Sequence, residues 1–164
     1  MNETFTSRVW TLGDDIDTDI IIPTEYLALK TVKDMAPYAF SPLRPELASQ
    51  IQEGDILVAG KNFGCGSSRE QAPEIIKALG IRCVIARSFA RIFFRNAINI
   101  GLPVIICRDL YDHVSGGDEM ELSLSEGIAR TGGQEYVCTK LPPYMQQILD
   151  QGGLLASLNG MTEN

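Results

Sequence analysis

The sequence predicts an α/β fold, and three observations carry this prediction. Between residues 54 and 106, short apolar runs alternate with helical patterns, as in a unit of parallel strands joined by helices. A glycine follows each of the two helical patterns, where helices commonly end. Outside this stretch, polar and apolar residues alternate as they do in strands with one exposed face. We therefore expect a central parallel sheet, a βαβαβ unit, with flanking antiparallel strands.

Five elements make up the expected βαβαβ unit. In order they are strand, helix, strand, helix and strand, at residues 55–60, 69–80, 83–87, 89–101 and 103–107. Gly80 and Gly101 supply the two helix ends. Parallel strands joined in this way need crossover connections, which are right-handed in nearly all proteins.

The flanking strands are expected near both ends of the chain. Alternating patterns occupy residues 7–12, 120–125 and 135–140. A short helix, with proline at its start and glycine at its end, is predicted at residues 142–153. Residues 24–50 carry three prolines among short helical patches, and such proline-broken segments inside a domain are often functional loops.

Composition and charge exclude several classes of function. A length of 164 residues suits a single domain spanning residues 1–164. The net charge of −7 argues against nucleic acid or an anionic membrane as the main partner, but it leaves room for a local basic site that binds a small anion. No apolar run approaches the roughly 20 residues of a membrane span, and no secretory signal pattern is present. We expect a cytoplasmic protein that does not bind membranes.

The four cysteines, Cys65, Cys83, Cys107 and Cys138, do not form a metal-binding pattern. No two of them are spaced as C-x-x-C, and His113 is the sole histidine. We therefore expect no zinc site and no iron–sulfur cluster held by this chain alone. Cys83 and Cys107 lie in apolar, strand-like runs and are expected to be buried structural thiols. Disulfides are not expected in a reducing compartment.

The segment KNFGCGSSREQAP, residues 61–73, is the candidate site. It follows a buried strand and precedes a helix, so it is expected at the carboxyl end of a parallel strand, where open α/β sheets bind ligands. Gly64 and Gly66 permit backbone angles closed to other residues, or the close approach of a ligand. The start of the following helix favours an anion.

Two interpretations of this loop remain open from the residues alone. Ser67 and Glu70 have the S-x-x-E spacing of a capping box, in which case the serine caps the helix and Arg69 is solvated. Alternatively, the loop binds an anion. It is neither a Walker loop, since G-K-[ST] is absent, nor a nucleophile elbow. A catalytic Cys65 would need His113 as its partner, and we do not expect that role.

Three segments together resemble the signatures of the aconitase-family swivel domain. They are DDIDTDIIIP at residues 14–23, GKNFGCGSSREQAP at 60–73 and SFARIFFRNAINIGLP at 88–103. Their order and spacing are similar to those of the family, and the resemblance covers about residues 5–155. It implies a swivelling three-layer β/β/α domain, which agrees with a parallel unit and flanking antiparallel strands.

The resemblance also implies an activity and a partner. Family members reversibly dehydrate and hydrate a hydroxy-dicarboxylate, moving a hydroxyl group between adjacent carbons. Where the swivel domain is a separate chain, it is a small subunit that is active only with a large subunit, in a heterodimer or heterotetramer. The large subunit carries a [4Fe–4S] cluster that acts as a Lewis acid, so the resemblance implies no cofactor and no metal on this chain.

Individual roles are implied by matching residues to the family's motifs. Ser67 matches the catalytic base, which takes a proton from the carbon beside a carboxylate. Arg69 matches the residue that binds a substrate carboxylate, a task that suits a bidentate guanidinium. Ser68, Gly66 and Asp19 match further groups of the substrate-binding cleft.

Four other residues of the three motifs are interpreted as structural. Asp17 and Thr18 are expected to shape the turn around Asp19 through local capping of the backbone. Arg91 and Asn96, in the third motif, are expected to tie the domain together rather than to touch substrate.

The resemblance places the determinant of substrate specificity in the 24–50 loop. Family members read the variable group of the substrate near a tetrapeptide such as Y-L-R-T, and here Tyr26, Leu27, Ala28 and Leu29 read YLAL. Alanine in place of arginine favours an apolar group, as in isopropylmalate of leucine biosynthesis, dimethylmalate or citramalate, over the extra carboxylate of homoaconitate. Two alternatives remain, the small subunit of a related dehydratase that acts on dimethylmalate, citramalate or homoaconitate, and a non-catalytic anion-binding domain.

Overall fold

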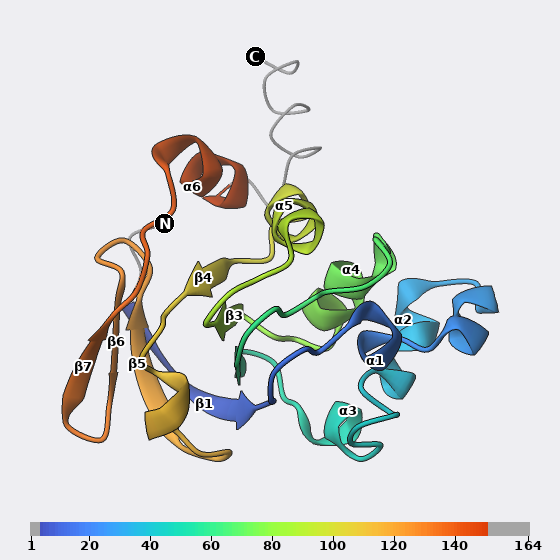
Figure 1. Cartoon of the computed structure of the whole chain (residues 1–164), viewed down its shortest axis with the longest axis horizontal. Coiled ribbons are helices and arrows are strands. Elements are labelled where there is room, and N and C mark those ends of the chain that lie inside the picture. The colour runs from blue at the N-terminus through green and yellow to red at the C-terminus, as the bar shows by residue number, and fades with distance from the viewer. Residues whose placement is uncertain (1–3, 151–164) are drawn as a thin grey trace.

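Seven strands form one mixed sheet in the order β4-β3-β2-β1-β5-β6-β7 (Figure 1). The structure is a computed structural model, and it describes residues 4–150. The strands are β1 (Thr4–Thr11), β2 (Ile56–Ala59), β3 (Cys83–Ala86), β4 (Val104–Ile106), β5 (Glu119–Ser123), β6 (Ile128–Thr131) and β7 (Gln134–Val137). Strands β1 to β4 pair in parallel, whereas β5, β6 and β7 pair in antiparallel fashion, so the predicted combination is confirmed.

Strand β1 belongs to both parts of the sheet. Its first half, Thr4 to Arg8, is antiparallel to β5, whereas Val9 to Thr11 pair in parallel with Ile56 to Val58 of β2. One strand therefore connects the antiparallel part to the parallel part. Figure 1 shows the antiparallel strands at one end of the molecule and the short helices α1 (Thr18–Ile21), α2 (Val32–Met35) and α3 (Leu47–Gln50) at the other.

Two hydrophobic clusters lie on the two faces of the parallel strands. Leu57, Val84 and Val104 pack with Ile75 and other residues of the helices on one face. The alternate strand residues pack against the antiparallel strands on the other face, and these are Ile56, Val58, Cys83, Ile85 and Ile105 with Met120, Leu122 and Ala129. The result is three layers of antiparallel strands, parallel strands and helices, which confirms the β/β/α architecture.

The longer helices are α4 (Gln71–Ala78), α5 (Arg91–Asn99) and α6 (Pro143–Asp150). Gly80 and Gly101 follow α4 and α5 with φ of +96° and +85°, so the predicted glycine ends are confirmed. Both helices begin about two residues later than the sequence pattern suggested. The glycines predicted to end α6 lie outside the described residues. No helix within residues 4–150 is long and apolar enough to cross a membrane.

The proline-broken segment consists of short helical turns packed on the core. These turns, with the one that precedes them, are α1 (Thr18–Ile21), η1 (Thr24–Ala28), α2 (Val32–Met35), η2 (Ala36–Tyr38) and α3 (Leu47–Gln50). Phe40 anchors the segment, because its side chain is fully buried and its N–H donates to the carbonyl of Ile21 at 3.1 Å. A further turn, η3 (Tyr111–His113), precedes β5.

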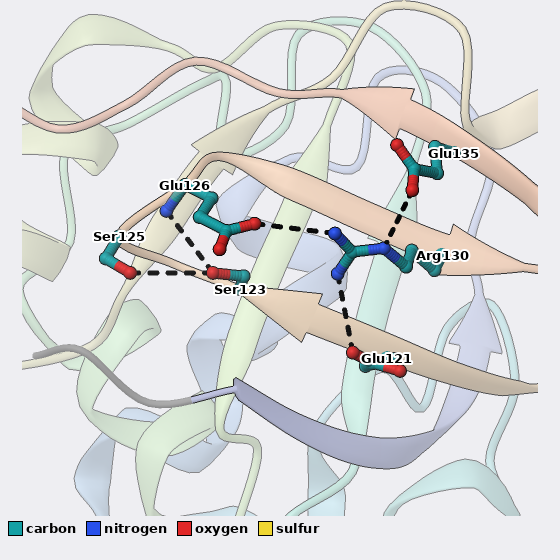
Figure 2. A network of polar contacts seen from close by, with 6 residues as sticks. All are labelled: Glu121, Ser123, Ser125, Glu126, Arg130 and Glu135. Atoms are coloured by element: carbon teal, nitrogen blue, oxygen red, sulfur yellow. Dashed lines mark hydrogen bonds and ion pairs between the residues drawn. The ribbon is translucent and has the colours of Figure 1, made fainter.

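Strand β6 was not predicted, because its four residues, IART, include the charged Arg130. Two other features define it. Gly132 and Gly133, both with positive φ, form the two-residue turn between β6 and β7, a geometry typical of hairpins. Figure 2 shows the second feature, in which the guanidinium of Arg130 contacts three carboxylates on β5, β7 and the β5–β6 turn. These carboxylates are Glu121 at 3.4 Å, Glu135 at 3.0 Å and Glu126 at 3.4 Å.

Candidate active site

The loops that carry the first two motifs lie side by side beyond the ends of β1 and β2. Five backbone hydrogen bonds join the two segments. They run from Leu12 N–H to Val58 O (2.9 Å), Gly60 N–H to Gly13 O (3.1 Å), Asp15 N–H to Lys61 O (2.8 Å), Gly64 N–H to Ile16 O (2.7 Å) and Thr18 N–H to Cys65 O (2.9 Å). The parallel pairing of the strands thus continues into the loops. The position of the candidate loop is set by the main chain of a segment about 47 residues earlier.

The third motif pairs with the other side of the candidate loop. Phe63 N–H donates to Ser88 O at 3.0 Å, and Ala90 N–H donates to Phe63 O at 2.9 Å. Below this bridge, the buried ring of Phe63 packs edge-on against Phe93 with 5.2 Å between ring centroids. All three motifs therefore meet at the carboxyl edge of the parallel strands, where the sequence predicted the site.

Gly64 is required for steric reasons as well as for its backbone conformation. Its φ is +83°, and a Cβ atom placed there would lie 2.3 Å from Cγ of Phe93. We expect Gly64→Ala to lower the free energy of unfolding by about 3 kcal/mol, because backbone strain adds to overpacking against a buried ring. Urea unfolding of the purified chain measures this change.

Gly117→Ala is the matched control for Gly64→Ala. Gly117 has φ of +95° and open space around the position of a Cβ, so this variant reports backbone strain alone. The steric argument is wrong if the two variants are equally destabilised.

Ser67 is exposed, and its main chain rather than its side chain is anchored. The buried hydroxyl of Thr18 donates to the carbonyl of Ser67 at 2.8 Å. The Ser67 hydroxyl has no hydrogen-bond partner among residues 4–150. The capping-box hypothesis is wrong, because α4 begins at Gln71 with Glu70 at its N-cap, and no side chain caps it. The loop is held by its pairing with the first motif instead.

Arg69 is held by three groups of the first motif and the turn after it. Its Nη1 donates to the carbonyl of Ile22 at 2.8 Å, and its Nη2 donates to Oγ1 of Thr24 at 2.8 Å. Asp19 forms an ion pair with Nη2 at 2.5 Å. The Arg69 side chain is 15% exposed and that of Asp19 66%, so the arginine is fixed in place while the carboxylate faces solvent.

A cavity of about 280 Å³ opens beside this arrangement. Its lining comes from all three motifs and consists of Thr18, Gly64, Gly66, Ser68, Arg69, Ala90, Arg91, Ile92, Phe93 and Asn96. Ser67 and Asp19 are neighbours of lining residues but are not part of the wall. Gly66 has φ of +90°, and this conformation turns the chain just before the two serines.

Three residues that sequence reasoning treated as structural line this cavity. Thr18 does shape the turn, as predicted, but it also forms part of the wall. Arg91 and Asn96 do not tie the domain together as expected, because neither side chain makes a hydrogen bond or ion pair in the described part of the chain. For Arg91, the signal that could have identified it was its charge beside the apolar residues of the first helical turn.

The four residues of YLAL do not line the cavity. Tyr26 stacks on Tyr38 with 4.1 Å between ring centroids and 5° between ring planes. Tyr26 and Leu27 are partly buried against the core, whereas Ala28 and Leu29 are exposed. The link between this segment and the site is the bond from Arg69 to Thr24, two residues before Tyr26.

The cysteines are free thiols, and three of them are buried. Cys83 and Cys107 are 0% and 2% exposed, which confirms their predicted burial. No group of three His, Cys, Asp or Glu residues between residues 4 and 150 is arranged to hold a metal ion.

Cys65 is the one thiol in the candidate loop. Partial burial, followed by the negative charges of Asp17 and Asp15, raises its pKa above that of an ordinary cysteine. A raised pKa lowers the thiolate fraction at every pH below it, which opposes a nucleophilic role.

We expect iodoacetamide to label native Cys65 with a pH midpoint higher than that of an unfolded peptide of the same sequence. Mass spectrometry of the labelled protein measures the rate at each pH. Asp15→Asn removes one of the negative charges and should lower the midpoint. A native midpoint at or below that of the peptide would contradict the assignment.

The fold and the site define a swivel domain of the aconitase class. The chain belongs to the aconitase C-terminal domain family, which matches residues 23–108. A crystal structure of 3-isopropylmalate dehydratase from Methanocaldococcus jannaschii superposes with a TM-score of 0.92 at 40% identity, covering 98% of this chain and 96% of that one.

Two curated relatives carry the same name. The 3-isopropylmalate dehydratase small subunit of Lachnospira eligens is 64% identical over 164 residues, which cover 98% of this chain and 99% of that protein. The protein of the same name from Methanosarcina mazei is 52% identical over 150 residues, covering 90% of this chain and 92% of its own length. The resemblance seen in the three motifs is therefore confirmed at the level of the family.

Proposed function

We propose that this chain acts as the small subunit of a 3-isopropylmalate dehydratase. This hydro-lyase interconverts 2-isopropylmalate and 3-isopropylmalate by dehydration and rehydration in leucine biosynthesis. The observation that carries the proposal is the cavity at which three motifs meet, with Ser68 and Arg69 in its wall, in a chain 64% identical to a protein of that name. Residues 1–164 are proposed to form one swivel domain.

Ser67 is the proposed catalytic base. Dehydration removes a hydroxyl group from one carbon and a proton from its neighbour, and Ser67 takes that proton. Its exposed hydroxyl is free to face a substrate, because no group of the described chain engages it. A serine alkoxide needs stabilisation, and the adjacent Arg69 guanidinium and the loop N–H groups are the candidates to provide it.

Arg69 is the proposed carboxylate-binding residue. A guanidinium has five N–H donors, and three of its possible bonds are already made to Ile22, Thr24 and Asp19. These contacts orient the side chain before substrate binds, which lowers the entropic cost of binding. The remaining donors on a wall of the cavity suit a carboxylate oxygen. Ser68, Gly66 and Asp19 complete the proposed substrate-binding groups.

The remaining machinery is proposed to lie on a large subunit. The relatives' names describe a small subunit, which implies a larger partner. We place the [4Fe–4S] cluster of the family on that partner, as the resemblance implies. A heterodimer or heterotetramer and a cytoplasmic location stay predictions from the sequence.

Residues 24–50 are the proposed specificity loop, and they support an apolar substituent on the substrate. Ala28 and Leu29 are exposed, and with Tyr26 and Leu27 they leave no charge in YLAL. Because these residues do not line the cavity of the isolated chain, we propose that they reach the substrate when the large subunit closes the site. An isopropyl group matches their apolar character.

Reconstitution tests the proposed function. The large subunit encoded with this chain is purified anaerobically with its cluster and assayed with 2-isopropylmalate. Activity should be absent from either subunit alone and appear on mixing. A stable complex that turns over none of the hydroxy-acids would favour the non-catalytic binding domain instead.

A further inference from the structure

The first turn of α5 brings a second arginine to the cavity. Ala90, Arg91, Ile92 and Phe93 line the cavity together with Arg69, so two guanidinium groups border one space. Both come from motifs that the main chain holds side by side. In a chain of net charge −7, two arginines at one cavity form a local basic site.

Arg91 has no ionic or hydrogen-bonding partner within residues 4–150. It differs in this from Arg69, which is held by three groups, and from Arg87, which pairs with Asp112. Its exposed side chain therefore does not contribute to the fold through any polar contact. The structural role that the sequence suggested for Arg91 therefore does not explain why an arginine stands at this position.

The position of Arg91 is also unfavourable for the helix that carries it. It is the first residue of α5, where the partial positive charge of the helix dipole favours acidic side chains. No acidic residue stands in the first turn, and no side chain caps the helix at Ala90. The helix start and the guanidinium thus present uncompensated positive charge. Positive charge at a helix start goes against the usual preference for acidic residues there, and such departures are typical of functional sites.

We propose that Arg91 binds the second carboxylate of the substrate while Arg69 binds the first. This assignment rests on the proposed function, because it needs a substrate with two carboxylates. It makes Arg91 a substrate-binding residue, whereas the sequence had suggested a structural role for it. The two arginines together would select dicarboxylates over monocarboxylates.

Arg95 is the matched control. It lies four residues further along the same helix, is likewise exposed and has no polar partner in the described chain, but it does not line the cavity. Arg91→Gln and Arg95→Gln therefore remove the same charge from the same helix. Only the first removes it from the cavity.

The test measures binding of substrate analogues to the reconstituted complex by calorimetry, which does not depend on turnover. The dianion is 2-isopropylsuccinate, and the monoanions 4-methylpentanoate and 2,3-dimethylbutanoate each lack one of its two carboxylates. Arg91→Gln should lower the affinity for the dianion by about 10- to 100-fold, as expected for the loss of a hydrogen bond to a charged group. Of the two monoanions, it should lower the affinity only for the one that retains the carboxylate bound by Arg91. Arg91→Lys should restore part of the affinity, and Arg95→Gln should change none of the three by more than twofold.

Two results would overturn the assignment. One is dianion binding within twofold of the wild type in Arg91→Gln. The other is weakened assembly with the large subunit in place of weakened dianion binding, which would make Arg91 an interface residue. Failure of the proposed function looks different, because the wild-type complex itself would then neither bind the dianion nor turn over isopropylmalate.

Discussion

Ser67→Ala in the reconstituted enzyme is expected to lower kcat by about 10³-fold, within the range for loss of a general base. The fold and the assembly with the large subunit should be unchanged. The reason lies in the contacts of the residue, because its hydroxyl bonds to nothing in the described chain and does not cap α4. The bond from Thr18 reaches the Ser67 carbonyl, which alanine keeps.

Steady-state kinetics and sedimentation of the complex measure these two properties. Ser68→Ala, the same change at the adjacent hydroxyl, should cost much less in kcat because it removes only a substrate contact. If Ser67→Ala dissociates the subunits or leaves turnover near normal, Ser67 is not the base.

Arg69→Lys is expected to raise KM by about 10- to 100-fold, a loss typical of hydrogen bonds to a charged group. A lysine ammonium cannot reproduce the planar fork that contacts Ile22 and Thr24 while binding a carboxylate. Kinetics of the complex measure KM, with Arg95→Lys as the control for an exposed arginine outside the cavity. Near-normal kinetics would remove Arg69 from the carboxylate role.

A purely structural role for Arg69 predicts a different pattern. Asp19→Asn keeps a hydrogen-bond acceptor beside Arg69 but removes the ion pair, so it loosens the contact between the two motifs while the guanidinium itself stays. If thermal stability falls equally in Arg69→Lys and Asp19→Asn while KM stays constant, the arginine serves only to join the two motifs.

The parallel unit could be predicted because its strands are buried on both faces. All four residues of β2 and all four of β3 are buried, which produces the uninterrupted apolar runs ILVA and CVIA in the sequence. The helix ends could also be predicted, since Gly80 and Gly101 adopt conformations that glycine favours. Strand β6 was missed because its partners and its glycine turn, rather than its own residues, define it.

The geometry of the site was harder to predict from the sequence, because long-range contacts determine it. The S-x-x-E spacing at Ser67 suggested a local cap, but the loop is shaped by the main chain of residues 13–18. Arg91 looked structural until its lack of partners and its place in the cavity wall were visible. The sequence resemblance places YLAL at the substrate. In the isolated chain, however, Tyr26 stacks on Tyr38, and none of the four residues lines the cavity.

The measurement that tests the central claim most directly is kcat/KM of the reconstituted complex for four hydroxy-acids in parallel. These are isopropylmalate, citramalate, dimethylmalate and homocitrate, which share the carboxylate-bearing core and differ in the variable group. We predict a clear preference for isopropylmalate, since the chain offers two arginines for carboxylates and an uncharged YLAL for the substituent. Preference for homocitrate, with its additional carboxylate, would contradict the apolar specificity assigned to this subunit.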